Sequence, residues 1–238
     1  MITKFANPGR FLKLADRVMP VAAVVALTAL ASGLYYGLLA SPPDYQQGDS
    51  VRIMYIHVPA AWMAMFIYAS MAAAAIVGIV WKHVVAELYP RALAPVGAAF
   101  TFICLLTGSL WGKPMWGTWW VWDARLTSVL ILFFLYLGYM ALTDAFDDEQ
   151  KGINAGAYLL LIGAVNIPVI KFSVDWWNTL HQPASLMRFA RPAIDNAMLV
   201  PLLLMALAFK ALYVFLVCVR LQTEIAKRRQ RVQEGSAG

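Results

Sequence analysis

Long apolar runs alternate with short polar connections along the chain. Each run holds roughly the 20 residues that an α-helix needs to cross the hydrocarbon core of a bilayer. The pattern therefore predicts an all-α membrane protein with six transmembrane helices. The predicted spans are 18–40, 57–81, 92–111, 126–143, 153–170 and 197–219.

The composition indicates lipid as the solvent of this chain. Hydrophobic residues make up 61% of its 238 residues and charged residues only 13%, which is too little charge for the polar shell of a soluble domain. No soluble domain or long linker is evident, so we predict a single integral membrane domain over residues 1–238. Cys104 and Cys218 lie inside apolar runs at different predicted depths, so they are interpreted as buried thiols rather than a disulfide.

Lysine and arginine are distributed unevenly between the two sides of the predicted bundle. The richer side takes the N-terminal segment, the second and fourth connections and the basic C-terminal tail. Short segments rich in these residues stay in the cytoplasm, so both termini are predicted to be cytoplasmic. Three segments then face outward: 41–56, 112–125 and 171–196.

Tryptophans gather on the outward side. They are Trp111, Trp116, Trp119, Trp120, Trp122, Trp176 and Trp177. Tryptophan favours both interfaces of a bilayer, whereas the inward side of this chain has little besides Trp81. The asymmetry indicates a platform for a flat apolar ligand, with an interfacial aromatic belt as the alternative. A helix over 115–122 would place Trp116, Trp119 and Trp120 on one face along the membrane surface.

Two of the three histidines lie on the same side as these tryptophans. His57 opens the second span, in YIHVPAAW, and His181 lies in the third outward segment, in WWNTLHQP. Two imidazoles flanking an aromatic surface are a ligand set for a six-coordinate haem iron. Zinc would need three or four close ligands, and no HExxH motif or cysteine cluster supplies them. His83 falls on the inward side and is interpreted as an ordinary solvated histidine.

Charged residues near the two histidines are candidate partners for haem propionates. Arg52 precedes His57 by five residues, and Arg125 follows the tryptophans. Both could bind propionates, with ordinary interfacial arginines as the alternative. Asp123 also has two interpretations, a cap on the helix that begins near Arg125 or a direct contact to haem.

Motifs for several other activities are missing. The chain has no GxxxxGK[ST] phosphate loop, so it cannot by itself drive transport by ATP hydrolysis, and it has no GxSxG or HExxH motif. Charge within the spans is limited to Lys210, and Asn166 is interpreted as a helix–helix hydrogen bond. Ion-coupled transport is therefore disfavoured, because it needs a chain of such polar groups.

The motif WGKPMWGTWWVWDARLTS resembles the tryptophan-rich signature of the haem-handling proteins of cytochrome c biogenesis. With YIHVPAAW and VDWWNTLHQPAS, the chain is similar over nearly its whole length to one branch of that family, cytochrome c maturation protein C, also called haem exporter protein C. The resemblance implies a component of the bacterial inner membrane, not an enzyme, that binds haem b at the periplasmic face. It further implies that this component presents haem to a membrane-tethered haem chaperone, maturation protein E. The implied complex contains two ABC-transporter subunits, maturation proteins A and B, and a small single-span protein, maturation protein D. The ATPase of that complex is maturation protein A.

The resemblance also implies roles for individual residues. His57 and His181 match the family's axial haem ligands, and Arg52 and Arg125 fall where the family places basic residues near the haem. The haem-handling segment is 112–125. The haem-contacting signature is matched by Trp111, Gly112, Trp116, Trp119, Trp120, Trp122 and Asp123.

Three other functions stay open at the level of sequence. An electron-transfer cytochrome b would usually carry histidines inside its spans, often as two stacked pairs, whereas this chain offers one pair at one face. A haem export channel would need a polar route through the spans, which the sequence hardly offers. An assembly subunit with an aromatic interface would bind no cofactor.

Overall fold

The computed structural model describes residues 7–177, 181 and 194–237, and within them it contains helices and no strand. The α-helices are α1 (Pro8–Leu34), α2 (Met54–Trp81), α3 (Val84–Trp116), α4 (Ala124–Asp144), α5 (Glu149–Gly163), α6 (Asn166–Trp176) and α7 (Asn196–Ala237). A π-helix, Tyr35–Ala40, continues α1, and a 3₁₀ turn, Asp49–Ile53, leads into α2. Six helical units are long and apolar enough to cross a membrane, with α5 and α6 together forming one. The prediction of an all-α protein with six spans is therefore confirmed.

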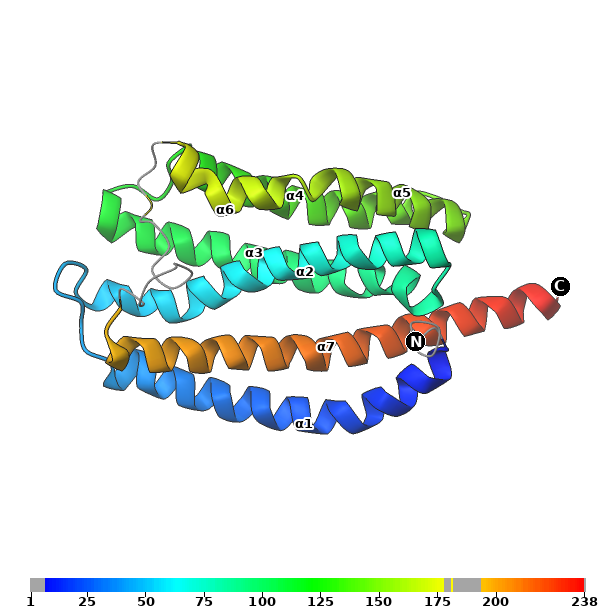
Figure 1. Ribbon diagram of the computed structural model, residues 1–238, viewed down its shortest axis with the longest axis horizontal. Coiled ribbons are helices and arrows are strands. Elements are labelled where there is room, and N and C mark those ends of the chain that lie inside the picture. Colours follow the sequence, from blue (N-terminus) through cyan, green and yellow to red (C-terminus); the bar gives the residue numbers. More distant parts are fainter. Residues whose placement is uncertain (1–6, 178–180, 182–193, 238) are drawn as a thin grey trace.

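The helices lie side by side in three layers (Figure 1). α1 packs along α7, α2 packs along α3, and α4 packs against α5 and α6. The pair of α2 and α3 forms the middle layer, and both of these helices also contact α7. The start of α2 and the end of α3 consequently lie at the same end of the bundle.

Tyrosines fill the contact between the middle layer and α4. Tyr68 and Tyr136 are fully buried, and their rings meet edge to face with centroids 5.3 Å apart. The Tyr136 hydroxyl donates to the Ala64 carbonyl at 2.7 Å, as a buried polar group in lipid requires. Gly97 makes room for this ring, because a Cβ atom there would overlap the ring of Tyr136. The small residue therefore lets α3 and α4 approach closely.

The fifth span consists of two helices rather than one. Pro168 cannot donate a backbone hydrogen bond to the Ala164 carbonyl, and its ring crowds that carbonyl, so the helix breaks between α5 and α6. Just after the break, Asn166 Nδ2 donates to the Ser128 carbonyl of α4 at 2.8 Å. The predicted helix–helix hydrogen bond of Asn166 is thus confirmed.

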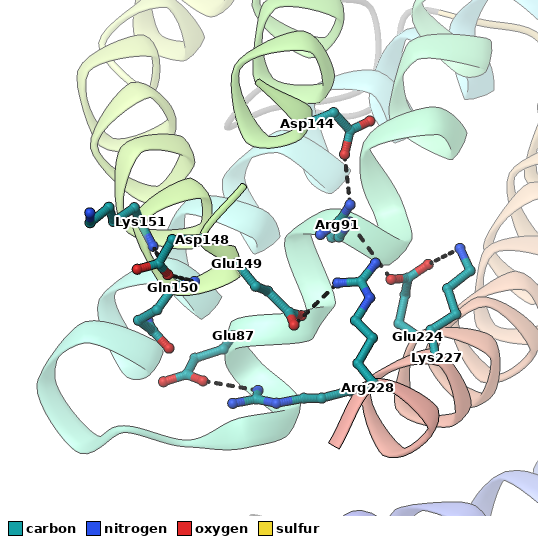
Figure 2. A network of polar contacts seen from close by, with 11 residues as sticks. Glu87, Arg91, Asp144, Asp148, Glu149, Gln150, Lys151, Glu224, Lys227 and Arg228 are labelled. Carbon is teal, nitrogen blue, oxygen red and sulfur yellow. Dashed lines mark hydrogen bonds and ion pairs between the residues drawn. The ribbon is translucent and has the colours of Figure 1, made fainter. Parts of the chain in front are cut away.

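α7 extends well past its predicted end at residue 219. Figure 2 shows the polar network that accompanies this extension, at the end of the bundle where α3 begins. Its ion pairs across elements are Arg228–Glu87 at 3.2 Å, Arg91–Asp144 at 2.6 Å, Arg91–Glu224 at 3.8 Å and Arg231–Glu149 at 3.2 Å. An apolar window detects only the part of a helix that lies in hydrocarbon, whereas ion pairs hold the remainder of α7 against α3 and α5.

Residues 115–122 do not form a helix, so the condition that would place three tryptophans on one face is not met. α3 ends at Trp116 because Gly117 adopts a left-handed conformation, with φ 75°, and its N–H donates to the Lys113 carbonyl at 3.1 Å. The chain then bends and stays irregular until α4 begins. Trp116, Trp119 and Trp120 therefore do not share one helical face.

Candidate functional site

Four helix ends bring the candidate residues to one end of the bundle. His57 lies in the first turn of α2, and Trp111 and Trp116 lie in the last turns of α3. Asp123 directly precedes α4, and His181 follows the end of α6. The ion-pair network of Figure 2 lies at the opposite end, where α3 begins and α7 ends.

His57 is held against the last turns of α3. Its Nδ1 lies 3.0 Å from Thr107 Oγ1, and its ring meets the Trp111 ring edge to face at 5.7 Å between centroids. Gly108 leaves room for the imidazole, because a Cβ atom there would stand 3.0 Å from His57 Cε1. Gly108 therefore lies directly against a candidate ligand.

His181 is held by the start of α4 and the end of α3. Its Nδ1 lies 3.0 Å from Asp123 Oδ2, and its ring meets the Trp116 ring edge to face at 4.9 Å. Burial lowers the pKa of His181 below its usual value, and the hydrogen bond to Asp123 opposes this effect. Burial thus favours the neutral ring, which is the form that binds a metal.

Asp123 has two functions that use different oxygens. Oδ1 accepts the backbone N–H of Leu126 at 2.7 Å, so the predicted cap on α4 is confirmed. Oδ2 faces His181, which the sequence analysis did not foresee. A direct contact between Asp123 and haem stays a prediction.

The tryptophans of segment 112–125 fall into two groups. Trp116 contacts a histidine, whereas Trp119 and Trp122 are 52% and 76% exposed. Trp120 packs edge to face on Trp122 at 5.6 Å, and its Nε1 is buried without a hydrogen-bond partner among the residues that the structure describes. A buried indole N–H usually has an acceptor, so this atom is available to a bound polar group.

Both candidate arginines donate hydrogen bonds to backbone carbonyls. Arg52 Nη1 donates to the Leu38 carbonyl at 2.5 Å, and its Nε pairs with Asp49 at 3.0 Å. Arg125 Nη2 donates to the Lys171 carbonyl at 3.4 Å, yet the charge of Arg125 is close enough to act on both imidazoles. The positive charge of Arg125 therefore acts on the candidate site. Arg52 instead links the end of the first span to the 3₁₀ turn that precedes α2.

Thr107 and Gln47 were missed by the sequence analysis. Thr107 contacts His57, and Gln47 Oε1 accepts a hydrogen bond from Trp111 Nε1 at 3.0 Å. The available signal for Thr107 was its position four residues before Trp111, which places both on one face of a helix. Gln47 gave no such signal, because it lies in a connection far away in sequence.

The residues at this end of the bundle fit a haem better than a metal ion alone. Two imidazoles, each with Nδ1 on a hydrogen-bonding partner, can offer Nε2 to an iron, and aromatic rings surround them. The described residues contain no group of three or more His, Cys, Asp or Glu side chains that could hold a metal ion. Cys104 and Cys218 are buried and free, which confirms their interpretation as thiols.

Comparisons with known proteins all point to the same protein family. Residues 1–236 match the Heme exporter protein C family. A Heme exporter protein C from Bradyrhizobium diazoefficiens is 57% identical over 226 residues, covering 95% of this chain and 86% of the relative. One from Escherichia coli is 49% identical over 234 residues, with coverages of 97% and 94%. A putative cytochrome c biosynthesis ccmC-like mitochondrial protein from Marchantia polymorpha is 48% identical, covering 77% of this chain and 76% of the relative.

Proposed function

The chain belongs to the Heme exporter protein C family, and on this premise we propose that it binds haem b between His57 and His181 and presents it to another protein. Family membership supports a role in haem handling for cytochrome c biogenesis by a multi-pass protein of the inner membrane. It also supports a haem-delivery subunit rather than a catalytic enzyme. The proposal adds the residues, the form of haem and the recipient.

The observation that carries the proposal is the matched setting of the two imidazoles. His57 on α2 and His181 beyond α6 lie 124 positions apart in sequence, yet both reach the same end of the bundle. Each has Nδ1 on a hydrogen-bonding side chain and a tryptophan ring at its edge. Such a hydrogen bond fixes the tautomer that leaves Nε2 for a metal.

The surrounding residues would orient the bound group. Trp111 and Trp116 pack on the two imidazoles, Trp120 offers its buried Nε1–H, and Arg125 supplies positive charge for propionates. When bound, haem supplies an iron for the two imidazoles and a vinyl edge for attachment elsewhere. This chain would position that edge and shield the iron, and it contributes no nucleophile of its own.

The exposed tryptophans suit presentation to a partner. Trp119 and Trp122 lie in the same segment as the site and are more than half exposed. We assign the recipient as the membrane-tethered haem chaperone, maturation protein E. The two ABC-transporter subunits, maturation proteins A and B, and the small single-span maturation protein D would complete the complex. They would supply the ATPase that this sequence lacks.

An absorption spectrum of the detergent-purified protein tests this function. Wild type, expressed together with the chaperone, is expected to show a low-spin haem b spectrum. The double variant His57→Ala/His181→Ala should lose haem or shift it to high spin, because it lacks both axial nitrogens. A spectrum and haem content identical in the two proteins would refute the ligand assignment. Wild type without any haem would favour an assembly subunit instead.

A further inference from the structure

The two histidines are held by different chemical groups, a hydroxyl and a carboxylate. What we infer from this difference rests on the proposed haem-binding function. We propose that Thr107 is a positioning residue that fixes the ring of His57 and makes it the weaker of two unequal axial ligands. Asp123 holds His181 as the stronger ligand. His57 would then hold a bound haem less firmly than His181 does.

The hydroxyl proton of Thr107 is already committed. Thr107 Oγ1 donates to the Ile103 carbonyl at 2.6 Å, one turn earlier in α3. A hydroxyl has one proton to donate, so toward His57 the same oxygen can act only as an acceptor. His57 Nδ1, 3.0 Å away, must therefore carry the ring proton, and Nε2 keeps its lone pair.

The ring of His57 also has little freedom to turn. Trp111 packs against it edge to face, and Gly108 brings the α3 backbone so near that a Cβ atom would stand 3.0 Å from Cε1. The Cys104 carbonyl, on the same helix α3, also accepts a hydrogen bond from the His57 ring. Thr107, Gly108 and Trp111 lie within two turns of one helix, so α3 alone determines the direction of the ligand.

Asp123 holds His181 in the same tautomer, but through a charged carboxylate instead of a neutral hydroxyl. The Asp123 carboxylate has no proton of its own to donate at neutral pH, so His181 Nδ1 donates to it. A hydrogen bond to a carboxylate is roughly twice as strong as one to a neutral oxygen and makes the ring a better electron donor. Thr107 is neutral, so His57 should be the weaker electron donor of the two imidazoles, although both rings have the same tautomer.

The tautomers can be measured without haem. Nitrogen NMR of the full chain, labelled with ¹⁵N-histidine and kept above about pH 8 in detergent, reports which nitrogen of each ring carries the proton. The chain has only three histidines. His83 serves as an internal reference of the opposite kind, because its Nδ1 accepts the Ala86 N–H at 3.2 Å and its proton must sit on Nε2.

We expect His57 and His181 in the Nδ1–H form and His83 in the Nε2–H form. Thr107→Val keeps the shape of the side chain but removes the acceptor, so the His57 signals should shift to mixed tautomers. Thr107→Ser should restore the wild-type signals. Unchanged His83 signals in all variants show that the fold is intact. A wild-type His57 in the Nε2–H form, or one unaffected by Thr107→Val, would overturn the positioning role.

Haem retention tests the inequality of the ligands. Loss of a group that orients a metal-binding histidine typically weakens metal affinity by about 10- to 100-fold. Thr107→Val should show a loss of this size, measured by transfer of haem to apomyoglobin, and Thr107→Ser should not. Thr101→Val is the matched control, because Thr101 Oγ1 donates to the Gly97 carbonyl of the same helix at 2.7 Å in the way that Thr107 Oγ1 donates to the Ile103 carbonyl. His181→Ala should lose haem faster than His57→Ala, and the reverse order would refute the inequality.

These outcomes separate the inference from the function beneath it. If neither histidine variant changes haem content or spectrum, the proposed function fails, whatever the NMR signals show. If both variants lose haem but Thr107→Val behaves like Thr101→Val, the function stands and the role of Thr107 is wrong.

Discussion

At the scale of single residues, the site depends on which ring nitrogen of each histidine carries the proton. Asp123 decides this for His181 and, with its other oxygen, also caps α4. The two tasks can be separated, because an amide can cap a helix but presents an NH₂ group where the carboxylate presents an acceptor.

Asp123→Asn should lower haem retention by about 10- to 100-fold while α4 keeps its cap. The amide oxygen would stay on the Leu126 N–H and the NH₂ group would face His181, which would move the ring proton to Nε2. Haem content per protein after purification measures the effect, and thermal unfolding in detergent checks the fold. Retention equal to wild type would mean that Asp123 does not orient His181.

Gly108→Ala should displace the His57 ring and reduce haem retention, because the new Cβ atom would stand 3.0 Å from Cε1. Gly138→Ala is the matched control, since a Cβ atom there meets only Leu159 at 3.9 Å, an ordinary contact. Alanine also favours the helical state at both positions by up to about 1 kcal/mol. Equal haem spectra for the two variants would show that the space at Gly108 is not needed by the ligand.

At the scale of elements, the residues of the candidate site lie at helix ends, and ion pairs join the helices at the opposite end of the bundle. The left-handed Gly117 stops α3 and frees the chain to turn toward Asp123, the cap of α4. At the other end, α7 continues beyond its apolar part because its basic residues form ion pairs with carboxylates on neighbouring helices (Figure 2). Glu87 is only 8% exposed, so its partner Arg228 matters for stability.

Arg228→Gln should destabilise the protein by about 1–3 kcal/mol, because it leaves the Glu87 carboxylate nearly buried without its cation. Arg228 is itself partly exposed, which limits the loss. Glu87→Gln in the same chain should recover much of it. Arg229→Gln, an exposed neighbour without an ion pair in the described part of the chain, is the control. Thermal unfolding in detergent compares the four proteins, and equal midpoints for Arg228→Gln and Arg229→Gln would contradict the prediction.

At the scale of the whole molecule, the two ends of the bundle differ in chemistry. One end holds His57, His181 and most of the tryptophans, and the other holds the ion pairs and the charged extension of α7 (Figure 2). The positive-inside rule assigns the charged end to the cytoplasm. The candidate haem site would then face the periplasm.

Single introduced cysteines test this orientation. Tyr45→Cys, at a position that is 91% exposed, should react with a membrane-impermeant maleimide in intact cells with a permeabilised outer membrane. Gln230→Cys, on the α7 extension, should react only after the inner membrane is opened. Cys104 and Cys218 are buried, so wild type provides the unlabelled background. The opposite labelling order would invert the topology and move the site to the cytoplasm.

The sequence by itself determined the six spans, the free cysteines and the family, and it offered the cap at Asp123 as one of two interpretations. These properties depend on local composition and spacing: an apolar run long enough for a bilayer becomes a span, and Asp before a helix caps it. The sequence also grouped His57 and His181 with the tryptophans, because the alternation of spans sends both to the same end.

Only the tertiary structure decided what each site residue touches. The pairing of Thr107 with His57 and of Asp123 with His181 depends on the rotation and depth of packed helices, which no local pattern encodes. Arg52 stays a candidate propionate partner by its distance in sequence to His57, and only the structure shows that it also donates to the Leu38 carbonyl of the neighbouring π-helix. The physical reason is that hydrophobicity sets which segments are buried, whereas side-chain geometry between helices sets which polar atoms meet.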